Sequence, residues 1–279
     1  MAMNNFTKRT ISGIGFLAIM ITSILANKYV FGTAMLTIMV IMMFEFLKMT
    51  CGNEYRYSQI LSMITGATMF VLTFFYSGFF MSGRFLVLSL IPFFILMINS
   101  LYVKDKTRFE KFACLYTAII YIALPWTMLN FAVFDPLTGD FSGKLILCFF
   151  AIVWGSDVGA YVFGVTLGQK FGGKLFPSVS PKKSWVGFWG GLFTAALVSV
   201  VLNLTGIFDF PLHHCIILAM ILNITGVYGD LIESQWKRHY EVKDSGNIIP
   251  GHGGMLDRFD SAILAIPSGV MYLIIMNLL

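Results

Sequence analysis

Long apolar runs separated by short charged segments make up most of the chain. Each run is close to the roughly 20 residues that a helix needs to cross the hydrocarbon core of a bilayer. The pattern therefore predicts an all-α, polytopic membrane protein with about nine transmembrane helices. The predicted spans are roughly residues 11–27, 30–47, 60–81, 85–103, 112–133, 145–166, 186–206, 213–236 and 258–279.

The lysines and arginines predict how these spans are oriented. When the N-terminus is placed on the cytoplasmic side, only Lys28, Arg84 and Lys144 of the 19 basic residues fall in the external loops. Because positively charged loops tend to stay in the cytoplasm, we predict a cytoplasmic N-terminus and an external C-terminus. We expect an integral protein of the cell (inner or plasma) membrane.

The composition excludes several other classes of protein. Of the 279 residues, 57% are hydrophobic and 12% are charged, about half the charged share of a soluble protein. This excludes a soluble cytosolic enzyme, a disordered chain and a nucleic-acid-binding module, despite the net charge of +5. We divide the chain into residues 1–140, with about five membrane helices, and a catalytic region at residues 141–279. The latter would hold about four helices and two cytoplasmic motif loops.

A polar stripe interrupts the eighth predicted span. Asp230, Glu233, Ser234 and Lys237 follow the spacing i, i+3, i+4, i+7 and therefore share one face of a helix. Because a charge at the centre of a membrane helix costs about 2.5–3.5 kcal/mol, we expect this stripe to face a wet cavity or a partner charge. The alternative is a simple ion pair of the Asp230–Lys237 kind at the helix end.

A second polar group lies where the last span begins. Residues 250–254 read Pro-Gly-His-Gly-Gly, and glycines before a helix let backbone N–H groups point at an anion. Asp257, Asp260 and Ser261 then share one face. Acidic residues in a first turn are also ordinary dipole partners, but capping explains one aspartate rather than two.

These residue types favour Mg²⁺ and phosphate chemistry. Asp230 and Asp257 come from separate helices, with lysines, arginines and glycine N–H groups nearby. Mg²⁺ typically takes one or two protein carboxylates and completes its shell with water and substrate oxygens. Phosphoryl or nucleotidyl transfer relies on metal and cations that neutralise phosphate charge, so it fits better than hydrolysis by a serine or cysteine nucleophile.

A longer pattern covers residues 234–260. Its fixed positions are Ser234, Lys237, Arg238, Lys243, Asp244, Pro250, His252, Gly253, Gly254, Asp257, Arg258 and Asp260. At this spacing they resemble the signature motif of the phosphatidate cytidylyltransferases, also called CDP-diacylglycerol synthases.

Two other segments extend this resemblance. Trp154–Tyr161, which contains Asp157, is similar to the Asp-x-x-Ala-Tyr segment of the family, and Ser180–Trp185 is similar to its Ser-Pro-Lys-Lys-Thr-Trp-Glu-Gly loop. The family usually has glutamate where this chain has Val186, so no role of that carboxylate carries over. The motifs cover roughly residues 145–279, and the first half resembles the family only in hydropathy.

The resemblance implies that the protein converts CTP and phosphatidate into CDP-diacylglycerol and pyrophosphate. The residues agree with this, because CTP is cytosolic and both motif loops are predicted on the cytoplasmic side. Phosphatidate would lie in the same leaflet, and its phosphate oxygen is already an anionic nucleophile. The remaining barrier comes from the electrostatic repulsion between two anions, which metal and cations lower.

We assign roles to the matching residues as a hypothesis. Asp230 and Asp257 would hold Mg²⁺, with a second metal ion as an option. Lys237, Arg238, Lys243 and Arg258 would neutralise phosphates and complete the catalytic set. The predicted substrate-binding residues are Ser180, Lys182, Lys183, Ser234, Asp244, His252, Gly253, Gly254 and Asp260.

Several alternatives stay open. A transporter could use the intramembrane acids Glu45, Asp157 and Asp230, and a cytidylyltransferase could act on another lipid phosphate. Asp157 could equally be structural, whereas for Glu45 a local pair with Lys48 is the favoured interpretation. A homodimer is one arrangement that would give a membrane enzyme a lipid-accessible groove.

Overall fold

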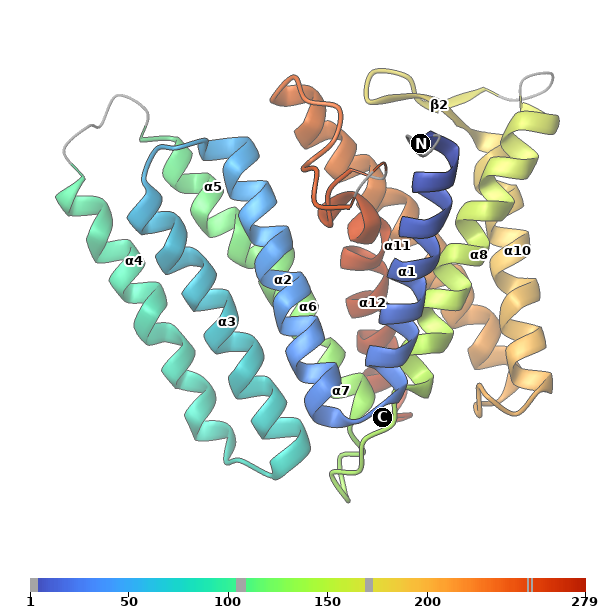
Figure 1. Cartoon of the computed structure of the whole chain (residues 1–279). Coiled ribbons are helices and arrows are strands. Elements are labelled where there is room, and N and C mark those ends of the chain that lie inside the picture. The colour runs from blue at the N-terminus through green and yellow to red at the C-terminus, as the bar shows by residue number, and fades with distance from the viewer. Residues whose placement is uncertain (1–4, 104–108, 169–172, 250, 252) are drawn as a thin grey trace. The chain divides into compact units, whose positions relative to one another are not determined.

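The computed structural model describes residues 5–103, 109–168, 173–249, 251 and 253–279, almost all of them in helices (Figure 1). Within these ranges, eight helical segments are long and apolar enough to cross a membrane, and α1 adds a shorter apolar stretch, Ser12–Leu25. The prediction of an all-α, polytopic membrane protein is therefore confirmed. Its orientation stays a prediction.

The elements follow the nine predicted runs closely. They are α1 (Asn5–Leu25), α2 (Lys28–Cys51), α3 (Arg56–Phe79), η1 (Gly83–Ser89), α4 (Leu90–Tyr102), α5 (Lys111–Ala118), η2 (Ile119–Ala123), α6 (Leu124–Thr127), α7 (Leu129–Val133), α8 (Lys144–Thr166), β1 (Lys174–Phe176), β2 (Ser180–Ser184), α10 (Trp185–Leu204), α11 (Leu212–His239) and α12 (Leu256–Ile275).

The chain forms two compact units. The first contains residues 1–142 together with Val242–Arg258, and the second contains Gly143–Glu241 together with Phe259–Leu279. The segment Val242–Arg258, which carries much of the sequence motif, therefore folds with the helices of the N-terminal half. Because α12 begins at Leu256, this helix starts in the first unit and continues in the second.

The core of the first unit is built around α2. One side of this helix buries large apolar side chains, among them Phe31, Met35, Met42 and Phe46. The indole Nε1 of Trp126 donates a hydrogen bond to the carbonyl oxygen of Met35 at 2.9 Å, so α6 is fixed against α2. In contrast, α4 buries only Leu96, and its remaining apolar surface is that expected of a lipid-facing helix.

The fifth predicted span is a broken helix rather than a continuous one. Between α5 and α6 the chain makes a π-helical turn, Ile119–Ala123, and Pro125 lies in the first turn of α6. Proline lacks a backbone N–H and cannot continue the regular hydrogen-bond ladder. The proline therefore accounts for the division of one apolar run into four short elements.

Close helix packing organises the second unit. Gly159 of α8 lies against Thr194 of α10, and Gly190 of α10 lies against the side chain of Phe163, so a methyl group at either glycine would overlap its neighbour. Small residues of this kind let membrane helices approach closely. The resulting α8–α10 pair carries Asp157 on one helix and begins the other directly after β2.

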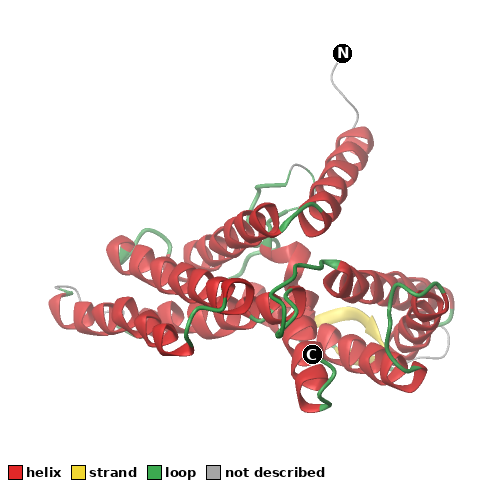
Figure 2. Ribbon diagram, turned by 90° about the horizontal axis from the view of Figure 1, so that it is seen from below, coloured by secondary structure: helices red, strands yellow, loops and turns green. Residues whose placement is uncertain are grey.

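A short hairpin precedes α10. Strands β1 and β2 are antiparallel, with Lys174 opposite Ser184 and Phe176 opposite Ser180, and they are the yellow element among the helices in Figure 2. The side chain of Ser184 accepts a hydrogen bond from the backbone N–H of Gly187 at 3.1 Å and thereby caps the N-terminus of α10. The hairpin is thus joined rigidly to a membrane helix.

Candidate active site

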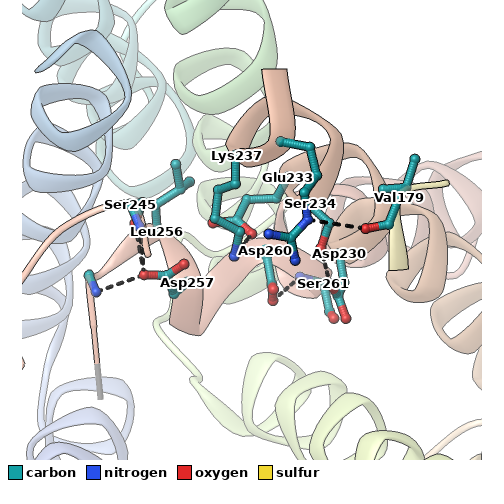
Figure 3. A network of polar contacts seen from close by, with 12 residues as sticks. Val179, Asp230, Glu233, Ser234, Lys237, Ser245, Leu256, Asp257, Asp260 and Ser261 are labelled. Carbon is teal, nitrogen blue, oxygen red and sulfur yellow. Dashed lines mark hydrogen bonds and ion pairs between the residues drawn. The ribbon is translucent and has the colours of Figure 1, made fainter. Parts of the chain in front are cut away.

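The polar stripe of α11 lies at the C-terminal end of that helix, in the second unit. Ser234 Oγ donates a hydrogen bond to Asp230 Oδ1 at 3.2 Å, and the ammonium group of Lys237 forms an ion pair with the carboxylate of Glu233 (Figure 3). The Glu233 side chain is fully buried and that of Lys237 is 14% exposed. A local ion pair of the kind expected by the alternative interpretation therefore forms at the helix end, but its acid is Glu233 rather than Asp230.

Asp230 instead pairs with the hairpin. Lys183 Nζ lies 2.6 Å from Asp230 Oδ2 and 3.5 Å from the carbonyl oxygen of Val227, so β2 is held against α11. The two side chains are 26% and 31% exposed, which leaves the ion pair accessible to a competing ligand. A second link comes from Arg238, whose Nε donates to the carbonyl oxygen of Val179 at 3.5 Å.

Two more aspartates belong to this cluster. Asp157 of α8 lies within electrostatic range of Asp230 and Lys183, and Asp260 of α12 lies within range of Asp230, Asp157 and Lys237. Three carboxylates from three different helices therefore converge in the second unit. We name Asp157, Lys183, Asp230, Lys237 and Asp260 the aspartate cluster.

A cavity of about 630 Å³ opens beside the aspartate cluster. Asp157, Lys174, Lys182, Lys183 and Asp230 form its charged wall. The lining also contains apolar side chains, which come mainly from the two close-packed helices: Ala160, Val165 and Phe188, with Val227 from α11. A cavity lined by both charged and apolar residues suits a ligand that has both a phosphate and a hydrocarbon part.

The second polar cluster lies in the first unit, at the start of α12. Asp257 Oδ2 accepts hydrogen bonds from the backbone N–H of Ser245 at 2.9 Å, from Ser245 Oγ at 3.1 Å and from the backbone N–H of Gly254 at 2.8 Å. We call residues 242–255 the glycine loop. Gly253 adopts a φ of +88°, a conformation that favours glycine, and a methyl group there would approach Asp257 Oδ2 within 2.8 Å.

The glycine loop borders a polar groove of about 830 Å³. Lys243, Asp244, Asn247 and Arg258 line it together with the backbone of Gly251 and Gly253. Two cations and two glycine backbones are a suitable lining for an anionic group. The predicted residues Lys243, Asp244, Gly253 and Arg258 are therefore brought together here, whereas His252 lies outside the described residues.

Glu45 is a residue of this cluster that the sequence did not indicate. It is 2% exposed in α2, and its Oε2 accepts a hydrogen bond from the backbone N–H of Leu256 at 2.9 Å. Lys48, its expected partner, instead has its ammonium group 6.0 Å from the ring centre of Phe44. The interpretation of a local Glu45–Lys48 pair is wrong, although a buried acid in an apolar run was itself a signal of a distant partner.

The second unit gathers oxygen atoms of the kind that a divalent cation prefers. Carboxyl groups of Asp157, Asp230, Glu233 and Asp260 lie near the ammonium groups of Lys183 and Lys237. Within the described ranges, no group of three or more His, Cys, Asp or Glu side chains could hold a metal ion by itself. Mg²⁺ would therefore need oxygens from water or substrate, which is its usual behaviour.

Comparison with known proteins gives a consistent set of relatives. A model of the cytidylyltransferase family matches residues 7–276. A phosphatidate cytidylyltransferase of Bacillus subtilis is 36% identical over 182 residues, 64% of this chain and 65% of the relative. Those of Staphylococcus saprophyticus and Staphylococcus aureus are 38% and 48% identical, over 62% and 44% of this chain and 64% and 46% of the relatives. The chain thus spans between 46% and 65% of the length of these relatives.

Proposed function

The chain belongs to the cytidylyltransferase family, and from this premise we propose that it transfers CMP from CTP to phosphatidate, giving CDP-diacylglycerol and pyrophosphate. The observation that carries the proposal is the accessible Lys183–Asp230 ion pair in the lining of a cavity that has both charged and apolar residues. The relatives named phosphatidate cytidylyltransferase support the choice of substrates.

The proposed reaction needs no nucleophile from the protein. A phosphate oxygen of phosphatidate attacks the α-phosphorus of CTP, the bond from that phosphorus to the bridging oxygen of the β-phosphate breaks, and pyrophosphate leaves. Both reactants are anions, so the protein must neutralise charge and align the two groups. Lysines and arginines at the two clusters supply that neutralisation.

Lys183 has the clearest role in this scheme. Without substrate, its ammonium group is neutralised by Asp230. A bound phosphate competes with Asp230 for the same ammonium group, so binding releases a carboxylate at the position where a cation is needed. Lys182 and Ser180, on the same strand, and Arg238, next to the hairpin, would contact the remaining phosphate oxygens.

The polar groove of the first unit would bind a second anionic group. Lys243 and Arg258 would neutralise it, and the backbone of Gly253 would allow its close approach. The N–H of Gly254 already donates to Asp257, so this glycine serves the loop itself rather than a phosphate. Ser234, Asp244, Lys237 and His252 complete the proposed substrate-binding and catalytic residues.

We propose Mg²⁺ as the cofactor, with a second metal ion as an option. When bound, it would supply positive charge to the phosphates of CTP. Asp230 and Asp257 are the proposed ligands, and the part-exposed carboxylate of Asp230, with Asp157 and Asp260 nearby, supports the first of these. Asp260 follows Asp257 by three residues in α12 and would support or replace it.

The remaining proposals concern location. We propose that the protein resides in the cell membrane with its active site facing the cytoplasm, where CTP is available. The 16% aromatic content and the large exposed apolar side chains of the described helices suit a lipid environment. Homodimer formation is also proposed, and cross-linking in native membranes would test it.

The decisive experiment is a transfer assay with purified protein in detergent micelles. The assay contains Mg²⁺, phosphatidate and CTP labelled at its α-phosphate, and label is counted in the lipid extract. Asp230→Asn should abolish transfer, whereas Asp209→Asn, an exposed carboxylate outside the cluster, should retain it.

Each outcome of this assay has a distinct meaning. Label in lipid that depends on phosphatidate, Mg²⁺ and Asp230 supports the proposal. Transfer only to another lipid phosphate keeps the mechanism and changes the acceptor. No transfer to any acceptor from well-folded protein overturns the proposal and returns the transporter as the working hypothesis.

A further inference from the structure

Glu45 lies outside every motif of the sequence, yet its carboxylate is buried against the glycine loop. We propose that Glu45 is a positioning residue: from α2 it holds the glycine loop and the start of α12 in the arrangement that presents Asp257, Lys243 and Arg258 to substrate. The inference rests on the proposed function for its catalytic consequence. The structural part of the inference rests only on the contacts that Glu45 makes with the loop and with α12.

Glu45 first acts as a cap for α12. Leu256 is the first residue of that helix, and the N–H groups of a first helical turn have no acceptor within the helix. Glu45 Oε2 accepts the N–H of Leu256 at 2.9 Å, and its negative charge lies at the positive end of the helix dipole. A residue 211 positions earlier in the chain therefore fixes where α12 begins.

Two glycines of the loop enclose the same carboxylate. A methyl group at Gly246 would overlap Glu45 Oε1, and one at Gly254 would overlap both Glu45 Oε2 and Ser245 Oγ. The loop backbone therefore approaches Glu45 on both sides. This explains why glycine is needed at position 254 of the His-Gly-Gly sequence, since its N–H serves Asp257 and its missing side chain makes room for Glu45.

Ser245 connects Glu45 to Asp257. Its hydroxyl lies 3.4 Å from Glu45 Oε2 and 3.1 Å from Asp257 Oδ2, and its backbone N–H donates to Asp257 at 2.9 Å. Glu45 thus contacts the chain at Ser245 and Gly246 and again at Gly254 and Leu256. Some groove residues lie between these contacts, and Lys243, Asp244 and Arg258 lie within two residues of them, so the carboxylate restricts the segment on which all of them stand.

The burial of Glu45 indicates that its carboxylate needs hydrogen-bond partners and does not merely fill space. An ionised carboxylate inside an apolar helix is costly unless hydrogen bonds compensate for the lost water. In the described part of the chain Glu45 Oε1 accepts no hydrogen bond, so Oε2 carries the compensation. An apolar side chain would stabilise α2 at lower cost but could not accept the N–H of Leu256.

The first experiment measures the loop without reference to activity. Hydrogen–deuterium exchange of the peptide covering residues 242–258 is compared among wild type, Glu45→Ala, Glu45→Gln and the control Glu54→Gln. Glu54 belongs to the same unit and pairs with Lys111 at 2.9 Å. Glu45→Ala should raise exchange about tenfold or more, Glu45→Gln should raise it less because its amide oxygen still accepts, and the control should match wild type.

The second experiment measures kinetics in the transfer assay. Glu45→Ala should lower kcat/KM for CTP by about thirtyfold or more, with a melting temperature close to that of wild type. A matched pair tests the geometry: Gly246→Ala should lose activity, and Glu45→Asp in the same chain should restore part of it, because the nearest atoms to a methyl group at Gly246 all belong to the Glu45 side chain and the shorter side chain leaves room for it. A general loss of stability would not be restored by shortening a second side chain.

The outcomes separate the possibilities. Unchanged exchange in Glu45→Ala overturns the contact with the loop, and faster exchange with unchanged kcat and KM overturns the positioning role. If Glu45→Ala does not fold, Glu45→Gln and the Gly246→Ala pair decide in the same way, and absence of rescue overturns the proposed geometry. If wild type transfers no label, the proposed function is wrong. The exchange data still show in that case whether Glu45 holds the glycine loop.

Discussion

The two polar clusters of this protein satisfy their carboxylates in opposite ways. In the aspartate cluster, Asp230 is paired with the side chain of Lys183, and both are about a quarter to a third exposed. In the glycine loop, Asp257 is satisfied by Ser245 and by the backbone N–H of Gly254. The carboxylate of Asp230 is thus paired with a charged side chain, whereas that of Asp257 is bound mainly by backbone N–H groups.

This difference indicates which cluster can exchange partners. A lysine ammonium can leave a carboxylate for a phosphate at small cost, because both pairs are charge-assisted. Backbone N–H groups that fix a loop cannot leave without unfolding it. The aspartate cluster is therefore suited to binding and releasing substrate, and the glycine loop to holding cations of a groove in place.

The largest expected effect comes from Asp230. Asp230→Asn should lower kcat by at least about a hundredfold, because neutralising this position removes the proposed metal ligand and the partner of Lys183. Its stability should change little, since the position is partly exposed. The transfer assay and the melting temperature measure the two quantities, and near-normal kcat would contradict the assignment.

Asp257 should behave differently under the same kind of substitution. Asp257→Ala removes the acceptor of three hydrogen bonds and should both abolish turnover and loosen the glycine loop. Asp257→Asn retains one oxygen acceptor and should preserve more of the fold than of the activity. Hydrogen–deuterium exchange of the 242–258 peptide, measured together with kcat, distinguishes these effects. Exchange as slow as in wild type for Asp257→Ala would contradict the view that Asp257 holds the glycine loop.

Substitution of Lys183 should mainly weaken the binding of substrate. Lys183→Ala should raise KM for CTP or phosphatidate about tenfold, the amount expected for one charge-assisted contact. Lys183→Arg keeps the charge and should restore part of the affinity. A kcat loss with unchanged KM for both substrates would argue against competition between Asp230 and phosphate.

The smallest effect is expected at Asp135, an exposed carboxylate in the loop after α7. The backbone N–H groups of Leu137 and Thr138 hold the pKa of Asp135 below its usual value. A lowered folded-state pKa means that the stabilisation is present at neutral pH and is lost as the pH falls through that pKa. Asp135→Asn should therefore lower the melting temperature slightly at pH 7 and not at pH 3, with unchanged turnover.

The sequence alone determined the helices. The apolar runs are long enough to span a bilayer, and each predicted run became helical: seven as single helices, one as η1 followed by α4, and one, at Pro125, as a chain of short helical elements. Hydropathy acts locally along the chain, so a single sequence contains this information. The spacing within α11 likewise placed Asp230, Ser234 and Lys237 on one face, because helical periodicity is fixed.

Only the tertiary structure decided which charges meet. Asp230 pairs with Lys183, 47 positions away, rather than with Lys237 on its own helix, and Glu45 contacts Leu256 rather than Lys48. Such partners depend on which helices pack together, and hydropathy does not encode that choice. The motif was readable from the sequence, but the residue that holds its loop was visible only after residues 242–258 had folded against α2.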